Sequence, residues 1–275
     1  LWKAHGNGMG RQTGEKLAVD PKKSDIVLCG TRRDGLFKST DAGKTWQKIS
    51  SIGEASGADL LNQNGISFVF FDSTSAATTS GATSVIYMGV SDTTSNLYKS
   101  TDGGSTWNPV SGGPASMMPH RVTMLNGNLY ITFSNNTGTH NVTQGAFYKY
   151  NTASGVWTNL TPKEGDSYLG SGGQSYAHGF GGVSIDPADE NHILISTLNY
   201  YGGLSRYATG EQGWGDRIYV TKDGGQTWKT TFTYAETANA ATANVGVKDN
   251  NWIAGHAIHW AGCITFNPFN TNEAW

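Results

Sequence analysis

An eight-residue phrase, Ser39-Thr-Asp-Ala-Gly-Lys-Thr-Trp46, decides how this chain folds. It returns as Ser100-Thr-Asp-Gly-Gly-Ser-Thr-Trp107 and, with threonine first, as Thr221-Lys-Asp-Gly-Gly-Gln-Thr-Trp228. This S-x-D-x-G-x-T-W pattern is the Asp box. A phrase that repeats along a chain predicts a fold built from copies of one structural unit.

The spacing of the boxes predicts one further, degraded copy. Their tryptophans are 61 and 121 residues apart, so the second interval is almost twice the first. Tyr150-Asn-Thr-Ala-Ser-Gly-Val-Trp157 lies in the second interval and keeps the final tryptophan. We therefore expect a fourth unit there.

Each box follows a short segment of alternating apolar and polar residues, which is typical of a β-strand. These segments are Gly35–Lys38, Asn96–Lys99, Ala146–Lys149 and Arg217–Val220. Within the box, the aspartate is expected to cap backbone N–H groups of its own turn, and glycine supplies a positive φ. The tryptophan begins the next strand and covers its neighbour. Structural roles are therefore predicted for Asp41, Trp46, Asp102, Trp107, Asp223 and Trp228.

A second phrase opens each unit with an apolar run that ends in Asp or Asn. Its copies are Leu17–Pro21, Phe68–Asp72, Val122–Asn126, Val183–Pro187 and Ile264–Pro268. One unit thus consists of strand, turn, strand, loop, strand, box and strand, a meander of roughly 40 to 60 residues that is typical of a propeller blade.

We predict an all-β fold, a β-propeller of four-stranded blades and of the seven-bladed type. The blade units are placed at 16–65, 66–119, 120–180 and 181–261, with an incomplete unit at 262–275. Since a closed ring of seven such blades needs roughly 400 residues or more, the chain is interpreted as part of a larger propeller protein.

Composition narrows the possible partners. Charged residues make up only 15% of the chain and its net charge is −2, with no basic run, which argues against nucleic acid. No apolar stretch approaches the ~20 residues needed to cross a bilayer, which argues against a membrane span. The histidines show no compact ligand spacing, so no metal or cofactor is expected. Sequons at Asn135, Asn141 and Asn159 are compatible with secretion to the extracellular space.

The side of the blades opposite the boxes carries the longer, irregular loops, and function usually lies on such loops. These loops are rich in aromatic residues, whose flat faces suit sugar rings, whereas few cations are present to attract an anion. A neutral polysaccharide is the expected ligand. The candidate binding residues are Tyr200, Tyr201, Trp214, Trp260 and His259, together with His120 and Arg121 just before a predicted strand. Packing between blades remains an alternative for the tyrosines, as does local hydrogen bonding for His120 and Arg121.

Longer stretches carry a family resemblance. His5–Pro21, followed by Gly30–Trp46, closely resembles glycoside hydrolase family 74, the xyloglucan-degrading endoglucanases and related xyloglucanases. Further landmarks similar to that family follow in the same order at Gly181–Pro187, Ser196–Tyr201 and Ile264–Asn270.

The resemblance implies two seven-bladed propellers with the substrate cleft between them, this chain being part of the first and forming one wall of the cleft. It implies a secreted enzyme that hydrolyses the β-1,4-glucan backbone of xyloglucan, a neutral plant cell-wall polysaccharide. The family's mechanism is inverting, with one aspartate as general acid and another as general base. Neither catalytic motif occurs here, so no catalytic residue is assigned to this chain.

Two other hypotheses stay open. A sialidase-like exo-glycosidase shares the Asp box, but it needs an arginine cluster and a Tyr–Glu pair, and the chain has only six arginines and no Arg-Ile-Pro start. A non-catalytic carbohydrate-binding or protein-docking propeller is compatible with the same residues, because the chain shows no complete acid–base pair.

Overall fold

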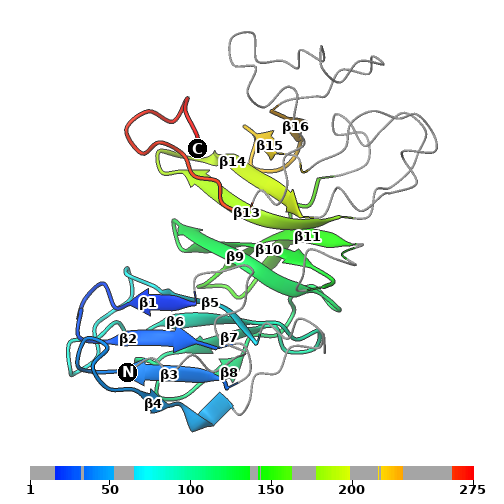
Figure 1. Cartoon of the computed structure of the whole chain (residues 1–275). Coiled ribbons are helices and arrows are strands. Elements are labelled where there is room, and N and C mark those ends of the chain that lie inside the picture. The colour runs from blue at the N-terminus through cyan, green and yellow to red at the C-terminus, as the bar shows by residue number, and fades with distance from the viewer. Residues whose placement is uncertain are drawn as a thin grey trace. The chain divides into compact units, whose positions relative to one another are not determined.

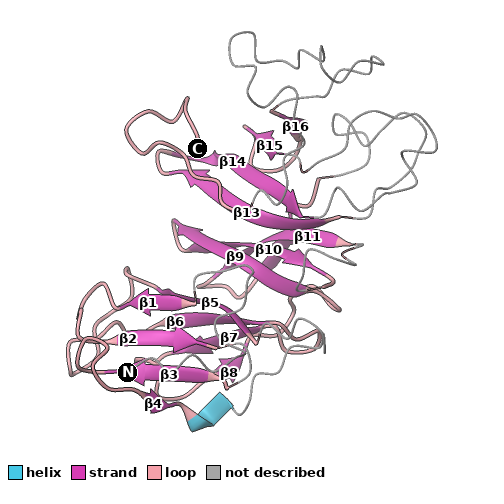
Figure 2. Ribbon diagram, in the orientation of Figure 1, coloured by secondary structure: helices cyan, strands magenta, loops and turns pink. Residues whose placement is uncertain are grey.

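The computed structural model describes residues 16–31, 34–52, 65–136, 142, 144–162, 178–198, 216, 218–231 and 262–275. In these ranges, sixteen strands form four antiparallel sheets of four strands each (Figure 1). Strands dominate the regular structure, and a short 3-10 helix, η1 (Ser50–Ile52), follows β4 (Figure 2). The chain divides into two compact units, Leu1–Met124 and Leu125–Trp275, and each is described by itself.

The first unit holds two sheets whose strands pair in chain order. The strands of the first sheet are β1 (Leu17–Val19), β2 (Val27–Gly30), β3 (Leu36–Ser39) and β4 (Gln47–Lys48). Those of the second sheet are β5 (Ile66–Phe71), β6 (Ile86–Val90), β7 (Leu97–Ser100) and β8 (Asn108–Pro109).

The two sheets of the first unit share one hydrophobic core. Leu28 and Leu36 from the first sheet and Ile66 and Ile86 from the second are fully buried in it. The sheets approach closely at Gly30, where an added Cβ would lie 2.4 Å from Cγ2 of Ile66. Leu36 belongs to one of the alternating segments, whereas β2, β5 and β6 are buried along almost their whole length, as is typical of strands covered on both faces.

The remaining strands form two more meanders. The third sheet contains β9 (Met118–Leu125), β10 (Asn128–Ser134), β11 (Gly145–Asn151) and β12 (Trp157–Asn159). The fourth contains β13 (Gly179–Asp186), β14 (Asp189–Leu198), β15 (Ile218–Thr221) and β16 (Lys229–Thr230). The boundary between the two units falls inside β9.

The core of the second unit is rich in aromatic side chains. Phe147 of β11 meets Trp228 edge to face, with ring centroids 5.8 Å apart. Tyr219 and Phe180 pack in the same cluster with Ile193. Edge-to-face pairs of this kind add roughly 0.5–1.5 kcal/mol to the burial of the rings.

The predicted order of elements within a unit is confirmed. The strands expected before the boxes are β3, β7, β11 and β15, and each box or degraded box joins the third strand of a sheet to the fourth. The placement of His120 and Arg121 just before a strand was wrong, because both lie inside β9. The strand contains Pro119, and because β9 is an edge strand, a proline without an N–H is tolerated there. The blade boundaries stay a prediction.

Candidate functional site

The turns of each sheet lie at the two ends of its strands, and successive connections between antiparallel strands alternate between these ends. The name edge is used below for such an end of the sheet and is distinct from an edge strand. The turn after the first strand and the Asp box lie at one edge, called here the box edge. The loop after the second strand and the linker to the next sheet lie at the opposite edge, called here the linker edge. In the second sheet, the linker edge consists of residues 91–96 and 110–117.

The first Asp box is a closed hydrogen-bonded turn. Thr45 donates its backbone N–H to Asp41 Oδ1 at 2.8 Å and its hydroxyl to Oδ2 at 2.6 Å. Ser39 donates its hydroxyl to Asp41 Oδ1 at 2.8 Å and accepts the N–H of Gly43. These donors, the Thr45 hydroxyl first, lower the pKa of Asp41 to about 2. The aspartate therefore holds the turn together, as predicted.

The other two complete boxes repeat this arrangement. Thr106 donates its N–H and hydroxyl to Asp102 at 2.9 and 2.6 Å. Thr227 does the same to Asp223 at the same distances. Burial raises the pKa of Asp102, but hydrogen bonds led by the Thr106 hydroxyl outweigh it and lower the pKa to about 2. The pKa of Asp223 is also lowered to about 2, first by the Thr221 hydroxyl.

The box tryptophans are not equivalent. The indoles of Trp46 and Trp107 donate to carbonyls of their own turns, Gly43 at 3.0 Å and Gly104 at 3.2 Å. Trp228 instead donates to the carbonyl of Leu160, 68 residues earlier, at 3.0 Å. The third box therefore links its sheet to the segment that follows β12.

The degraded box, Tyr150–Trp157, still forms a hydrogen-bonded turn, but other residues supply the donors and the acceptor. Asn151 takes the role of the aspartate, since its Oδ1 accepts the N–H and the hydroxyl of Ser154 at 2.8 and 2.9 Å. Its amide donates to Asn128 Oδ1 at 2.9 Å. Trp157 packs on the ring of Tyr150 at 4.7 Å between centroids. The motif is thus degraded in sequence while the hairpin is retained.

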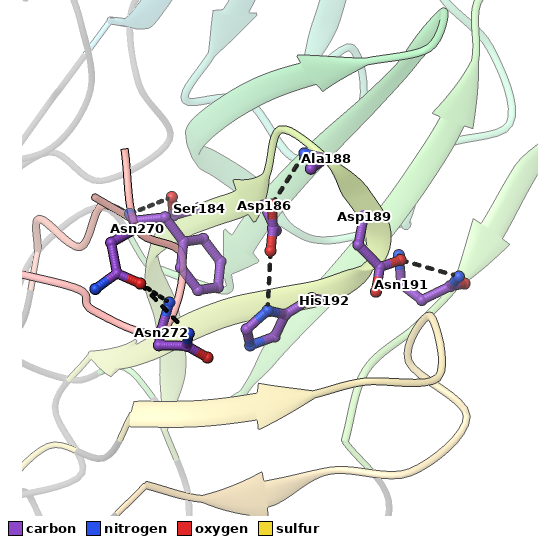
Figure 3. Close-up of polar contacts among 9 residues, drawn as sticks. Ser184, Asp186, Ala188, Asp189, Asn191, His192, Asn270 and Asn272 are labelled. Atoms are coloured by element: carbon purple, nitrogen blue, oxygen red, sulfur yellow. Dashed lines mark hydrogen bonds and ion pairs between the residues drawn. The ribbon is translucent and has the colours of Figure 1, made fainter. Parts of the chain in front are cut away.

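The box edge of the fourth sheet carries an acid–histidine pair (Figure 3). Nδ1 of His192, on β14, lies 3.2 Å from Oδ2 of Asp186, at the end of β13. The ring of Phe266 lies 4.6 Å from that of His192. Burial raises the pKa of Asp186, but the N–H of Ala188, the Thr271 side chain and His192 together lower it. These contacts fasten the segment from residue 262 to the sheet.

The linker edge of the second sheet is tightly hydrogen-bonded. Asp92 Oδ1 accepts the N–H groups of Thr94 and Ser95, at 2.6 and 3.0 Å. Asn96 donates both amide hydrogens across the edge, to the carbonyl of Pro114 at 3.1 Å and to that of Met117 at 2.9 Å. Sequence reasoning treated Asn96 only as the start of a strand, and no motif in the sequence pointed to this role.

The described candidates for ligand contact lie near linker edges. His120 is buried and Arg121 is half-buried, both near the start of β9. In the fourth sheet, Thr197 donates its hydroxyl to the buried carboxylate of Asp216 at 2.9 Å. Sequence reasoning did not select Asp216. Contact of His120 and Arg121 with a ligand stays a prediction.

The remaining predicted site residues lie outside the described residues. They are Tyr200, Tyr201, Trp214, His259 and Trp260. Among the residues that the structure describes, no group of three or more His, Cys, Asp or Glu side chains is arranged to hold a metal ion. In the same residues, no helix is long and apolar enough to span a bilayer.

Comparison with known proteins supports the repeat. The model of the BNR/Asp-box repeat family matches residues 37–48 and 219–230. A xyloglucanase of Paenibacillus sp is 36% identical over 243 residues, which are 82% of this chain and 21% of that protein. A xyloglucanase of Hypocrea jecorina is 36% identical over 249 residues, 85% of this chain and 27% of that protein.

A solved structure matches nearly the whole chain. The crystal structure of the Niastella koreensis GH74 enzyme superposes with a TM-score of 0.75 at 37% identity, covering 99% of this chain and 36% of that one. This chain therefore spans between a fifth and about a third of the length of the relatives it matches. The four meander sheets, the Asp boxes and this match establish an all-β fold of the β-propeller class. The chain belongs to glycoside hydrolase family 74.

Proposed function

We propose that the protein to which this chain belongs hydrolyses the β-1,4-glucan backbone of xyloglucan. The observation that carries this proposal is the similarity to curated xyloglucanases over more than four fifths of the chain, joined to the structural match with a GH74 enzyme over 99% of it. No basic run accompanies the net charge of −2, which favours an uncharged polysaccharide over an anionic one.

The proposed contribution of this chain is one wall of the substrate cleft, formed by its linker edges and facing a second propeller domain. The Asp boxes at the box edges are short turns whose carboxylates bond within the turn. The linker edges carry the longer connections, and long loops on a rigid scaffold are where binding residues concentrate. Tyr200, Tyr201, Trp214 and Trp260 supply flat rings there, and His120, Arg121 and His259 supply polar contacts to sugar hydroxyls.

The proposed chemistry is an inverting hydrolysis by two carboxyl groups outside this chain. One carboxylic acid protonates the leaving oxygen, while the other group, as carboxylate, activates a water on the opposite side, which requires a separation of roughly 6.5–9.5 Å. The box aspartates do not suit the acid role. With pKa values of about 2, Asp41, Asp102 and Asp223 are ionised at neutral pH and hold no proton to donate.

We further propose that the protein is secreted. Asn159, the acceptor of one sequon, is exposed at the end of β12, and its Oδ1 accepts the N–H of Thr161 at 2.9 Å. An exposed acceptor on an outer strand is compatible with passage through a secretory pathway. Activity found in the culture medium of the source cells supports this proposal, and activity confined to the cells contradicts it.

The test of the activity uses the full-length protein. It is expected to release reducing ends from xyloglucan faster than from carboxymethylcellulose, and the products are expected to have inverted anomeric configuration, read by NMR during the first turnovers. Retained binding to xyloglucan without release of reducing ends would favour a non-catalytic carbohydrate-binding propeller. Release of sialic acid from a sialoside would favour a sialidase.

A further inference from the structure

We propose that Asn96 is a positioning residue, which holds the linker between the second and third sheets in the shape that substrate binding at the linker edge requires. This inference rests on the proposed xyloglucan hydrolysis. It names a residue that supports the binding surface without contacting the substrate. Asn96 itself is 5% exposed, so it acts through the backbone that it holds.

Both N–H donors of the Asn96 side chain bond to the linker. A side-chain amide has two N–H donors, and here they reach the carbonyls of Pro114 and Met117, 18 and 21 residues along the chain. Its own backbone carbonyl accepts the N–H of Val90 at 2.9 Å, which fixes Asn96 at the end of the β6–β7 loop. One side chain thus ties that loop to the last turn of the linker.

Backbone contacts support the same bridge. The N–H of Ser116 donates to the carbonyl of Thr93 at 3.2 Å, and Ser116 has a φ of 58°. A serine at positive φ carries a conformational cost that the surrounding contacts must offset. Together with the Asp92 cap, these bonds make the loop 91–96 and the end of the linker one connected piece.

The linker leads straight into the strand that carries predicted ligand contacts. Met117 is followed by β9, in which His120 and Arg121 are the third and fourth residues. Since a strand advances about 3.3 Å per residue and neighbouring side chains point to opposite faces, a displacement of Met117 shifts both side chains along the edge. Misplacement of roughly 1 Å is enough to change binding strongly.

The role needs an amide at this position. Asn96→Ala removes both donors and leaves two backbone carbonyls without their partners, which releases the linker. Asn96→Asp keeps the shape but places a carboxylate, which only accepts hydrogen bonds, against two carbonyl oxygens. Asn96→Ser retains one short donor and is the milder variant, in case the others fold poorly.

A matched control exists at the opposite edge. Asn128 of β10 is also a buried asparagine, 8% exposed, whose amide donates twice, to Glu190 Oε1 at 2.9 Å and to the Asn126 carbonyl at 3.4 Å. It lies at the box edge of the third sheet, directly after the turn that follows β9. Asn128→Ala therefore perturbs the fold through a comparable loss while leaving the linker edge of the second sheet untouched.

The experiment compares Asn96→Ala, Asn96→Ser and Asn128→Ala in the full-length protein, with steady-state kinetics on xyloglucan and hydrogen exchange of residues 110–117. Asn96→Ala is expected to raise KM by roughly five-fold or more with kcat within about two-fold of wild type, because binding and not chemistry is affected. Hydrogen exchange of residues 110–117 is expected to be faster in Asn96→Ala than in wild type. The increase is expected to be smaller in Asn96→Ser and absent in Asn128→Ala.

Three results would overturn the inference. They are an unchanged KM in Asn96→Ala despite faster exchange in the linker, an equal rise of KM in Asn128→Ala, and unchanged exchange in the linker. A wild-type protein without hydrolysis rejects the proposed function instead. In that case, the role of Asn96 is tested by electrophoresis of the same variants in a gel that contains xyloglucan, where binding slows migration. Only the Asn96 variants are expected to bind more weakly and therefore to migrate faster than wild type.

Discussion

The fourth residue of the first Asp box differs in backbone strain from its equivalents in the other two. Ala42 has a φ of 58°, whereas the equivalent positions are Gly103 and Gly224, both at 71°. A left-handed conformation costs a non-glycine residue roughly 1–2 kcal/mol. Replacement by glycine removes this cost, but glycine also loses more conformational entropy on folding, which offsets about half of the gain. The first box therefore contains a local strain that the other boxes avoid.

This strain predicts that Ala42→Gly stabilises the protein by about 0.5–1 kcal/mol, measured by urea denaturation. The reverse change provides the control. Gly103→Ala is expected to destabilise by roughly 1–2 kcal/mol, since its φ is unfavourable and the new Cβ lies 3.3 Å from Thr78 Cγ2. A loss of stability in Ala42→Gly would contradict the assignment of strain to this residue.

The box carboxylates also predict a dependence on pH. Their pKa values, about 2 in the folded protein, lie below the ordinary 3.8, so the folded state binds protons less readily than the unfolded one. The stabilisation is thus complete above about pH 4 and is lost as the pH falls through about 2. We expect the melting temperature to fall steeply in that window.

Asp102→Asn tests the source of this dependence. The amide retains one acceptor but does not titrate, so the variant is expected to be less stable at pH 6 and to lose less stability than wild type between pH 4 and pH 2. Scanning calorimetry across that range measures both effects. Parallel curves for the variant and wild type would show that Asp102 contributes nothing to the acid transition.

Single residues also show how far sequence reasoning extends. The hydrogen bonds of Asp41 and Asp102 follow from the motif, because all partners lie within four residues. The bond from Trp228 to Leu160 and those from Asn96 to its linker do not follow, since they join residues many positions apart. Local turn chemistry is encoded in the motif, whereas those partners depend on how the sheets and their linkers pack.

At the scale of elements, the residue that ends each opening strand often ties its sheet to the next. Asp20 accepts the N–H and hydroxyl of Thr83 at 2.8 and 2.5 Å. Asn126 donates to Glu190 at 3.2 Å, and Asp186 receives a bond from Thr271. The Asp or Asn of the second repeated phrase therefore fastens neighbouring meanders, a role that sequence spacing did not reveal.

Asp20→Ala is expected to destabilise the protein by roughly 2–4 kcal/mol, because it leaves the buried donors of Thr83 unpaired. Asp72→Ala is the matched control. Asp72 occupies the same position in the second phrase, but in the described residues its side chain bonds only within its own turn, to Thr74. We expect a loss of about 1 kcal/mol there. Equal losses by urea denaturation would contradict the role of Asp20 between sheets.

The elements themselves were largely predictable. Alternation before each box located β3, β7, β11 and β15, and the turn chemistry located the hairpins. The start of β9 was missed, since the strand begins at Met118 and includes Pro119, which is tolerated because β9 is an edge strand. Whether a strand lies at the edge of its sheet depends on the assembled sheet and cannot be predicted from the local sequence.

At the scale of the whole molecule, the repeat explains why each unit contains two meanders packed against each other. Each sheet buries an apolar face against its neighbour within the same unit, as Leu28 does against the second sheet and Phe147 does against the fourth. The carboxylates of the Asp boxes bond within their own turns, whereas the linker edges carry the longer connections and the proposed binding surface. The aromatic residues assigned to that surface are predicted from the sequence alone.

The most direct test of this account is the affinity of the full-length protein for xyloglucan oligosaccharides, measured by calorimetry in Tyr200→Ala, Tyr201→Ala and Val156→Ala. Loss of a stacking ring is expected to weaken binding by ~1 kcal/mol or more, roughly a five-fold rise in Kd, in at least one tyrosine variant. Val156, 57% exposed at a box edge, is the control and its variant is expected to bind as wild type does. Unchanged affinity in both tyrosine variants, or an equal loss in Val156→Ala, would contradict a binding surface at the linker edges.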